Sequence, residues 1–175
     1  MGAIIDPAIG CSSSILKEKI FFILLTHSHW DHIAEAEEIK NKTQAKIFIH
    51  KLDEGNLKKP GSDGLFFNLM AKGCFADHYL EDGEILEIGD LKIEILHTPG
   101  HTPGSCCFYL KNEKILFSGD TLFRGTYGRV DFPTSSEKSM KSSLKRLAKL
   151  PFDTKVYPGH GEETTIGKEK WLVDL

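Results

Sequence analysis

A seven-residue loop with the sequence THSHWDH constrains this chain more than any other feature. It places four potential metal ligands within six residues, directly after the apolar run Ile20 to Leu25. His27 and His29, two positions apart, can turn two imidazoles toward one ion, while Asp31 and His32 can serve a second ion. A lone histidine is more often an ordinary core or surface side chain. Three histidines and an aspartate between a buried strand and a helix instead predict a metal-binding turn.

The segments around this loop predict a mixed α/β fold. Apolar alternation and helix-forming composition give a βαβ pattern over residues 20–25, 34–42 and 46–50. Two hairpins are expected next, at 84–88 with 91–96 and at 105–110 with 114–117. A helix should begin after Ser135 or Ser136 and run to about Leu150, followed by a strand at 154–157 and a last helix at 166–175. Weaker patterns indicate a short helix at 12–18 and a helical apolar patch at 65–70. This order of elements predicts a layered α/β domain spanning residues 1–175.

Three later loops each add one side chain that can bind a metal. His101, Asp120 and His160 each follow a predicted strand, and ligand sites in α/β sheets form at such strand ends. Together with the first loop they make five histidines and two aspartates, enough for two ions that share one carboxylate. Nitrogen and oxygen donors without thiolate favour Zn(II), Fe(II) or Mn(II) over copper or an iron–sulfur cluster.

These motifs resemble the metallo-β-lactamase superfamily, and within it the short, glyoxalase II-like (hydroxyacylglutathione hydrolase-like) hydrolases. The resemblance rests on THSHWDH, HTPGHTPGS, FSGDTLF, GRVDFP and PGHGEETTIGKEK, which cover most of the chain. It implies an αββα four-layer sandwich with two metals at the edge between the sheets. It also implies that the first metal is bound by His27, His29 and His101, the second by Asp31, His32 and His160, and that Asp120 bridges them.

The resemblance implies a zinc-dependent thioester hydrolase. Two ions would lower the pKa of a shared water toward ~7, and the resulting metal-bound hydroxide would attack the carbonyl, with Asp31 orienting it and Asp120 holding both metals. The expected substrate is S-lactoylglutathione or a related small thioester. Two alternatives stay open: a mononuclear iron persulfide dioxygenase on the same scaffold, and a metal-binding module without turnover. A nuclease or a β-lactamase is less favoured.

The substrate-binding part of the resemblance is incomplete. Long-form glutathione thioester hydrolases have a Lys in the place of Arg129, a Tyr in the place of Asp131, and a second Tyr where this chain has Glu162. Either Arg129 binds a substrate carboxylate through its two-pronged guanidinium, or it pairs with Asp131 and shapes the loop. Arg124 and Tyr127 border the same loop and are further candidates. Glutathione thioesters and other small thioesters or esters therefore both stay open as substrates.

Composition limits partners and location. The formal charge is −3, with 22 basic and 25 acidic residues, so no overall basic field favours nucleic acid. The longest apolar run has six residues, against the ~20 of a membrane helix, and no secretory pattern is seen, so we expect a cytoplasmic protein without membrane contact. Adjacent Cys106 and Cys107 read as buried, reduced thiols. Asp6 and Pro7 lie very near the start of the sequence, whereas members of the family usually have two or three strands before this segment. We therefore expect the first N-terminal strands of the sandwich to be missing. A homo-oligomer could cover the sheet edge that this would expose.

Overall fold

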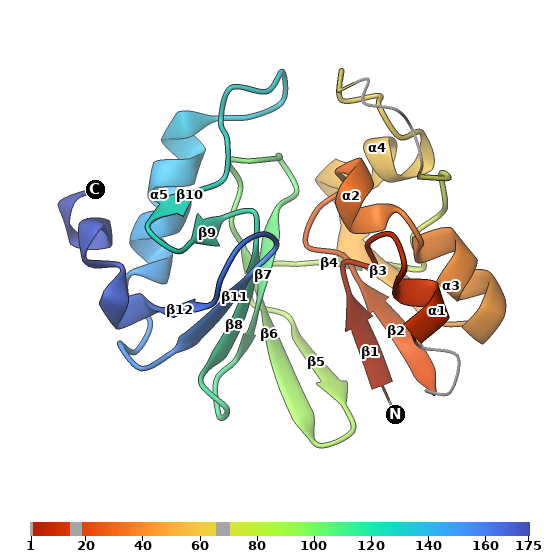
Figure 1. The fold of residues 1–175 in the computed structure, drawn as a ribbon, viewed down its shortest axis with the longest axis horizontal. Coiled ribbons are helices and arrows are strands. Elements are labelled where there is room, and N and C mark those ends of the chain that lie inside the picture. Colours follow the sequence, from red (N-terminus) through yellow and green to blue (C-terminus); the bar gives the residue numbers. More distant parts are fainter. Residues whose placement is uncertain (1, 15–18, 66–70) are drawn as a thin grey trace.

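Two β-sheets lie face to face, with helices on both outer sides, in the computed structural model, which describes residues 2–14, 19–65 and 71–175 (Figure 1). The first sheet is parallel with the order β1-β2-β3-β4. Its strands are β1 (Gly2–Ile5), β2 (Ile20–Leu24), β3 (Lys46–His50) and β4 (His78–Leu80). The helices on its outer side are α1 (Cys11–Ser14), α2 (Trp30–Ile33), α3 (Ala36–Thr43) and α4 (Glu54–Lys58), with a 3-10 turn η1 (Lys51–Asp53) before α4.

The second sheet is mixed and has the order β12-β11-β8-β7-β6-β5. Its strands are β5 (Ile85–Ile88), β6 (Leu91–His97), β7 (Cys106–Leu110), β8 (Ile115–Gly119), β11 (Lys155–Pro158) and β12 (Thr164–Thr165). A small ribbon of β9 (Leu122–Phe123) and β10 (Thr126–Tyr127) follows β8. On the outer side lie α5 (Glu137–Leu147) and two 3-10 turns, η2 (Ile166–Lys168) and η3 (Lys170–Asp174). The αββα sandwich expected from the sequence is therefore confirmed.

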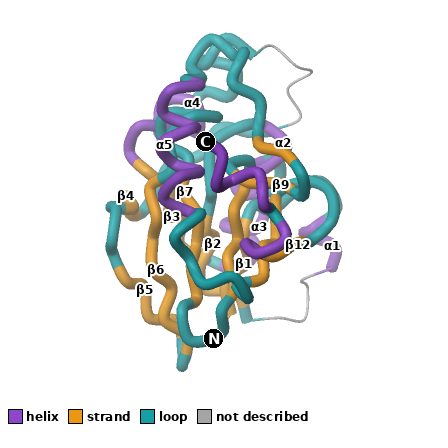
Figure 2. Tube along the Cα trace, turned by 90° about the vertical axis from the view of Figure 1, so that its left-hand side faces the viewer, coloured by secondary structure: helices purple, strands orange, loops and turns teal. Residues whose placement is uncertain are grey.

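Side-chain alternation along the strands divides the core into three layers. In β2 and β3, Ile23 and Ile47 pack toward the helices of the first sheet, whereas Leu24 and Phe48 face the second sheet. Such alternation follows from the two-residue period of a strand. The third layer joins the outer face of the second sheet to α5, through Met140, Leu144 and Leu147 among others. Both faces of both sheets are thus covered; Figure 2, which looks onto the layers, shows the strands running roughly vertically.

Most of the predicted elements are confirmed. The βαβ unit is present: the helix predicted at 34–42 is α3, and a further short helix, α2, lies before it within the His-rich loop. Both hairpins pair as expected, with Ile88 opposite Leu91 and Leu110 opposite Ile115. The cap of α5 is Ser136, whose side chain accepts a hydrogen bond from the backbone N–H of Ser139 at 3.2 Å.

Three predictions about elements need correction. Helix α5 ends at Leu147 rather than about Leu150, because Pro151 disfavours helical geometry in the residue before it. The last helix is replaced by the 3-10 turns η2 and η3, and β4 had not been predicted. Of the helix expected at 12–18, residues 15–18 lie outside the described residues, as do 66–70 of the apolar patch. No helix in the described ranges is both long and apolar enough for a membrane span.

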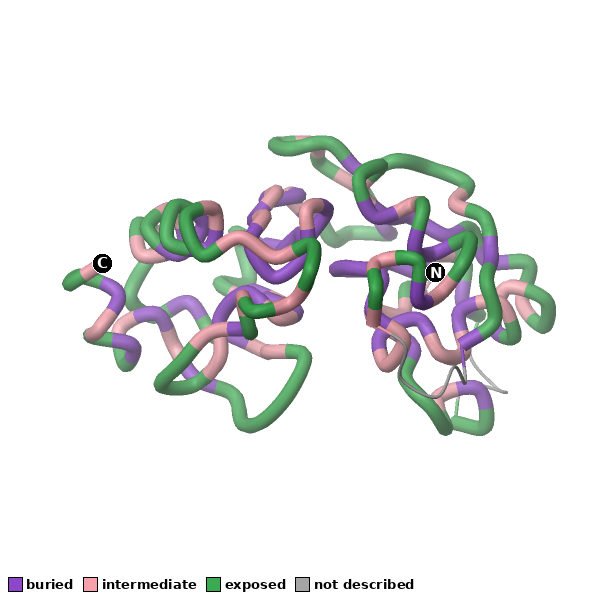
Figure 3. The backbone as a smooth tube through the Cα atoms, turned by 90° about the horizontal axis from the view of Figure 1, so that it is seen from above, coloured by how far each residue is buried: buried purple, intermediate pink, exposed green. Residues whose placement is uncertain are grey.

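The parallel strands of the first sheet all end at the upper edge in Figure 1. The second sheet contributes β8 and β11, which are also parallel and end at the same edge. Seen from above this edge, in Figure 3, buried backbone concentrates where the two halves face each other and exposed loops surround it. Loops that follow these strands therefore meet between the sheets.

Candidate metal centre

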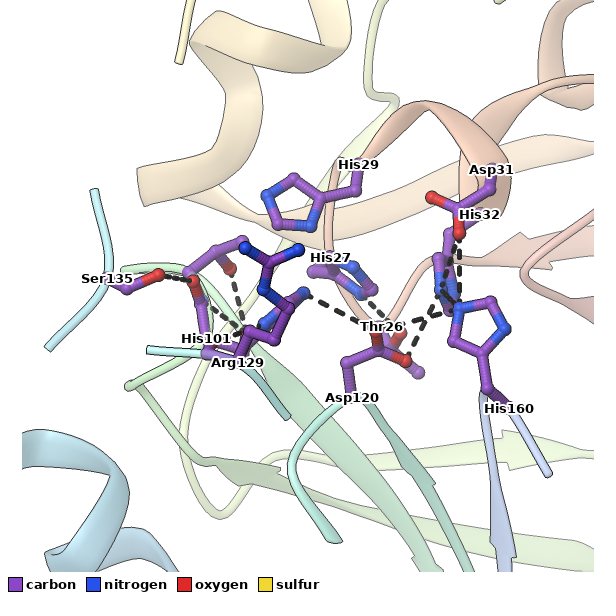
Figure 4. A network of polar contacts seen from close by, with 12 residues as sticks. Thr26, His27, His29, Asp31, His32, His101, Asp120, Arg129, Ser135 and His160 are labelled. Atoms are coloured by element: carbon purple, nitrogen blue, oxygen red, sulfur yellow. Dashed lines mark hydrogen bonds and ion pairs between the residues drawn. The ribbon is translucent and has the colours of Figure 1, made fainter. Parts of the chain in front are cut away.

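All seven residues singled out as metal ligands meet at this edge (Figure 4). The loop after β2 and the start of α2 supply four of them, and the loop after β6 supplies His101. Asp120 follows β8 and His160 follows β11, and the two loops are joined by a hydrogen bond of 2.9 Å from the Gly159 N–H to the Gly119 carbonyl. Parallel pairing of β8 with β11 explains why residues 40 positions apart in sequence lie side by side.

We call His27, His29 and His101 the first cluster. One potential ligand atom from each lies within 4.8 Å of the others, and all three residues are buried. Their Nε2 atoms have no hydrogen-bond partner among the described residues. Burial lowers the pKa of His27 well below its usual value and that of His29 to about 3, so the imidazoles are neutral and their lone pairs are available. Three unpaired buried nitrogens would be costly in an ordinary core, and they fit a divalent ion.

Hydrogen bonds at the opposite ring nitrogen orient two of these imidazoles. His101 Nδ1 donates to the Arg129 carbonyl at 2.9 Å. His27 Nδ1 donates to the Thr26 hydroxyl at 3.0 Å, because that hydroxyl itself donates to Asp6. In both rings Nδ1 is engaged and Nε2 is directed to the centre of the site, which is the arrangement expected of metal-binding histidines.

We call Asp31, His32 and His160 the second cluster. His160 Nε2 lies 3.1 Å from Asp31 Oδ2 and 3.2 Å from His32 Nε2. His32 is buried, whereas the side chain of His160 is 55% exposed. Two nitrogens and a carboxylate oxygen that converge from α2 and from the loop after β11 fit a second divalent ion.

Asp120 lies between the two clusters. Its Oδ2 is 3.4 Å from His101 Nε2, and its Oδ1 is 3.4 Å from His32 Nε2. The same Oδ2 is also 3.7 Å from His160 Nε2 of the second cluster. Burial alone would raise the pKa of Asp120, but the hydrogen bond and charge of His32 outweigh it and lower the pKa. A buried, ionised carboxylate in this position could bridge two ions.

Asp6 also belongs to this centre, and the sequence reasoning missed it. Its carboxylate accepts hydrogen bonds from the Thr26 N–H at 2.7 Å, the Thr26 hydroxyl at 2.6 Å and His32 Nδ1 at 2.9 Å. Burial opposes protonation of His32, but the charge of Asp6 and the bond to Asp120 raise its pKa to about 10. The sequence signal for Asp6 is its place directly after β1, because the carboxyl ends of neighbouring parallel strands share one edge.

Glycine is required where the PGHG motif passes the centre. A Cβ at Gly159 would overlap Asp120 Oδ1 and would lie 2.6 Å from His32 Cε1. Any larger residue would displace a side chain of the second cluster or Asp120.

A cavity of about 360 Å³ opens over the two clusters. Its apolar walls are Trp30, Leu65, Phe123 and Phe132. Arg129 also lines it and lies 4.5 Å from the Phe132 ring centroid. Apolar walls with convergent polar groups at one end are typical of a small-molecule site.

The three predicted substrate contacts lie in different surroundings. Arg129 donates to both oxygens of Asp131, from Nε at 2.9 Å and from Nη2 at 2.8 Å. Arg124 pairs with Glu162. Tyr127 packs against Trp171, with ring centroids 5.9 Å apart. Only Arg129 is among the described residues that line the cavity.

The remaining histidines and cysteines lie outside the two clusters. His97 Nε2 donates to the Pro103 carbonyl at 2.9 Å, in the loop that carries His101, and its ring stacks on His50 with centroids 4.0 Å apart. Cys106 and Cys107 are buried in β7, and burial raises the pKa of both thiols, as expected of structural cysteines.

Comparison with known proteins connects this geometry to characterised folds. A sequence profile of the metallo-beta-lactamase superfamily matches residues 3–160. Hydroxyacylglutathione hydrolase GloC of Haemophilus influenzae is 35% identical over 178 residues, covering 95% of this chain and 84% of the relative. Among solved structures, BLEG-1 B3 metallo-beta-lactamase has a TM-score of 0.88 at 34% identity, covering 95% and 84% of the two chains. TTHA1623 in a di-iron-bound form has a TM-score of 0.80 at 34% identity, covering 94% and 84%. The matched range includes both clusters and Asp120.

Proposed function

This chain belongs to the metallo-beta-lactamase superfamily, and from that premise we propose that it is a binuclear metal hydrolase that cleaves a small thioester. The observation that carries the proposal is the pair of ligand clusters with Asp120 between them. The first cluster holds buried nitrogens without hydrogen-bond partners among the described residues, which is the environment that a bound cation would complete.

The proposed ligands are the first cluster for one ion, the second cluster for the other, and Asp120 for both. Nitrogen and carboxylate donors without thiolate favour zinc, with Fe(II) or Mn(II) as the alternatives. The di-iron form of TTHA1623 supports iron as a real alternative. Two divalent ions held there would lower the pKa of a bound water toward ~7 and polarise the carbonyl under attack.

The chain's own residues then position the reactants. Asp31 is partly exposed beside the cavity, with Oδ2 on His160, and its second oxygen orients the attacking water. Trp30, Phe123 and Phe132 bind the apolar part of the substrate and limit the water around its carbonyl. No side-chain nucleophile is required, which agrees with the raised thiol pKa values of the buried cysteines.

A thioester is proposed as the substrate because the GloC relative is a hydroxyacylglutathione hydrolase. The thiol half need not be glutathione. Arg129 is the one cation among the described cavity-lining residues, and its guanidinium is already bound by Asp131. A thioester with few carboxylates therefore suits this cavity at least as well as S-lactoylglutathione. We place the activity in the cytoplasm, where buried thiols stay reduced.

Elemental analysis and thioester assays on the same sample test the proposal. We expect about two equivalents of zinc, iron or manganese per chain, and hydrolysis of S-lactoylglutathione or of another member of a thioester panel. One iron per chain with oxygen consumption on a persulfide would instead establish the dioxygenase alternative. Two bound ions without cleavage of any thioester would reduce the protein to a metal-binding module.

A further inference from the structure

Asp53 is a buried carboxylate outside both ligand clusters. It ends the 3-10 turn after β3 and is only 3% exposed. Burying a carboxylate is costly unless its oxygens are hydrogen-bonded, and this one accepts four hydrogen bonds. The donors are the Ser28 N–H at 2.9 Å, the Ser28 hydroxyl at 3.2 Å, the Thr102 hydroxyl at 2.9 Å and the Gly104 N–H at 2.7 Å. Both oxygens of the buried Asp53 carboxylate therefore accept hydrogen bonds, which offsets the cost of burying it.

These donors belong to the two loops that carry the first cluster. Ser28 stands between His27 and His29, and Thr102 directly follows His101. Within the described residues, Asp53 therefore ties together the two loops that carry the three imidazoles, although it contacts none of them itself.

Close packing holds Asp53 in this position. A Cβ added at Gly104 would lie 2.5 Å from Asp53 Oδ1, so the carboxylate lies directly against the backbone of the His101 loop. On the other loop, Asn56 Nδ2 donates to the Ser28 carbonyl at 2.7 Å and fixes the same turn from a second side. Neither loop can shift relative to the other without breaking several of these bonds.

Only a carboxylate satisfies all of these donors. Oδ1 receives the Gly104 N–H, and Oδ2 receives the Ser28 N–H together with two hydroxyls. An asparagine of the same shape would direct its NH₂ group at one of the two backbone N–H groups, whichever way it is turned, because backbone donors cannot reverse. Asp53→Asn therefore removes one anchor between the loops while keeping nearly the same volume.

We propose that Asp53 is a positioning residue for the first metal: it sets the spacing between the His27–His29 turn and His101, and thereby the affinity of the first cluster for its ion. The inference rests on the proposed metal assignment. It predicts an effect on the first cluster and none on the second, which has no hydrogen bond to Asp53 within the described part of the chain.

Metal titration of the 175-residue apo chain tests this. For the parent chain and Asp53→Asn, zinc affinity is measured by competition with a chromophoric chelator, and hydrogen exchange of the apo proteins is followed at Ser28 and Gly104. In Asp53→Asn we expect the tighter of the two binding steps to weaken about 10- to 100-fold, the usual cost of losing a group that orients metal ligands. The weaker step should be unchanged, and the amide that faces the new NH₂ group, that of Ser28 or of Gly104, should exchange faster.

Glu169→Gln is the matched control. Glu169 is another buried carboxylate, 4% exposed, which accepts hydrogen bonds from Gly125, Thr164 and Trp171, and none of these carries a proposed ligand. Its loss should lower thermal stability and leave both metal affinities at parental values. If Asp53→Asn does not fold by circular dichroism, Thr102→Val, which removes one donor, decides the question by the same titration.

The outcomes separate the inference from its premise. A parent chain that binds no metal ends the proposed function itself. A parent that binds two ions while Asp53→Asn, or Thr102→Val in its place, binds them equally well overturns only the role of Asp53. Equal weakening of both steps, or weakening matched by Glu169→Gln, would also overturn it, because the effect would then be general destabilisation.

Discussion

The two ligand clusters share one sheet edge but differ in how they are held. The first cluster is buried, its Nε2 atoms face each other without hydrogen-bond partners among the described residues, and Thr26 and Arg129 orient two of its rings. The second cluster is open on one side, since His160 is more than half exposed, and its members contact one another at 3.1 and 3.2 Å. One site is rigid and enclosed, and the other is accessible.

This difference assigns distinct tasks to the two halves. An ion that enters the first cluster displaces no hydrogen bond of its ligand nitrogens, so we expect it to bind more tightly and to remain during turnover. An ion in the second cluster must separate Asp31 from His160 and lies beside solvent and the cavity. We expect it to bind more weakly.

The largest effect is expected for Asp120→Ala, which affects both halves at once. Asp120 faces His101 with one oxygen and His32 with the other, so its removal deprives both ions of a ligand. If this costs about 4 kcal/mol of transition-state stabilisation, kcat/KM falls roughly 10³-fold. Steady-state kinetics and elemental analysis on one sample measure the result. Parental activity with two bound ions would contradict the bridging role.

The contrast itself is tested by His101→Ala against His160→Ala. The first should abolish the tighter binding step, and most activity with it, because a buried cluster cannot recruit solvent to replace the missing nitrogen. The second should remove only the weaker step, and water can partly replace an exposed ligand. Titration calorimetry of both apo variants measures the two steps. If His160→Ala lost the tighter step, the assignment of rigid and open halves would be reversed.

Asp6→Asn should produce an intermediate effect, larger on the second cluster than on the first, because Asp6 contacts His32 directly but reaches His27 only through the Thr26 hydroxyl. Asp6 orients His32 through Nδ1, and loss of such a partner typically weakens metal affinity about 10- to 100-fold. Because Asp6 also accepts two hydrogen bonds from Thr26, the apo variant should melt at a lower temperature as well. Metal titration and thermal melts of the same variant separate the two effects. An unchanged weaker step would show that His32 needs no such support.

The sequence singled out the candidate ligands, which the fold brings together, but not the carboxylates hydrogen-bonded around them. His101 and His160 stand in short motifs with Gly and Pro, and His27 stands in a His-rich turn after β2, so residue type and local pattern were sufficient to predict them as candidates. Asp6 and Asp53 are isolated aspartates whose partners lie 20 or more positions away. Their roles arise only when β1, β2 and β3 are aligned in parallel, and nothing local signals that alignment.

The same limit applies to β4 and to Arg129. Strand β4 has three residues, two of them exposed, and exists because β3 offers a parallel edge rather than because of its own pattern. For Arg129, the sequence left open a substrate carboxylate or a pair with Asp131. The structure contains the Arg129–Asp131 pair. Residue type alone could not have chosen between the two alternatives, because the choice depends on which groups are close in space.

Acid should lower the folding stability of the protein by protonating His50, which lies near the first cluster through His97. Burial, together with the stacked His97 ring, lowers the pKa of His50 to about 4 from an unfolded value near 6.5. The unfolded chain therefore binds this proton first, and stability is lost as pH falls from about 6.5 to about 4. Allowing for partial exposure, the loss is about 1–2 kcal/mol. His97, which stacks on His50, also contacts the His101 loop at Pro103. The stacked pair therefore lies closer to the loop that carries His101 than to the second cluster.

Thermal melts of metal-loaded His50→Gln and parent chain between pH 7 and pH 4 test this. The variant should lose less stability over this interval, a difference of roughly 2–6 °C in Tm at pH 4 relative to pH 7. Identical pH slopes would show that the stacked pair contributes no acid sensitivity. A faster loss of the tighter ion than of the weaker one on acidification would sharpen the contrast between the clusters.

The smallest effect is expected for Asp131→Asn, which separates the two functions of Arg129. The backbone carbonyl of Arg129 holds His101 in the first cluster, whereas its side chain lines the cavity and is bound by Asp131. Releasing the guanidinium should lower KM about two- to five-fold for a thioester with a carboxylate on its thiol half, since exposed ion pairs are weak. KM for a neutral thioester, kcat for both and the metal content should not change. A KM that fell equally for both substrates would show that Asp131 acts on the shape of the cavity, and a change in metal content would show that the side chain and the carbonyl of Arg129 are coupled.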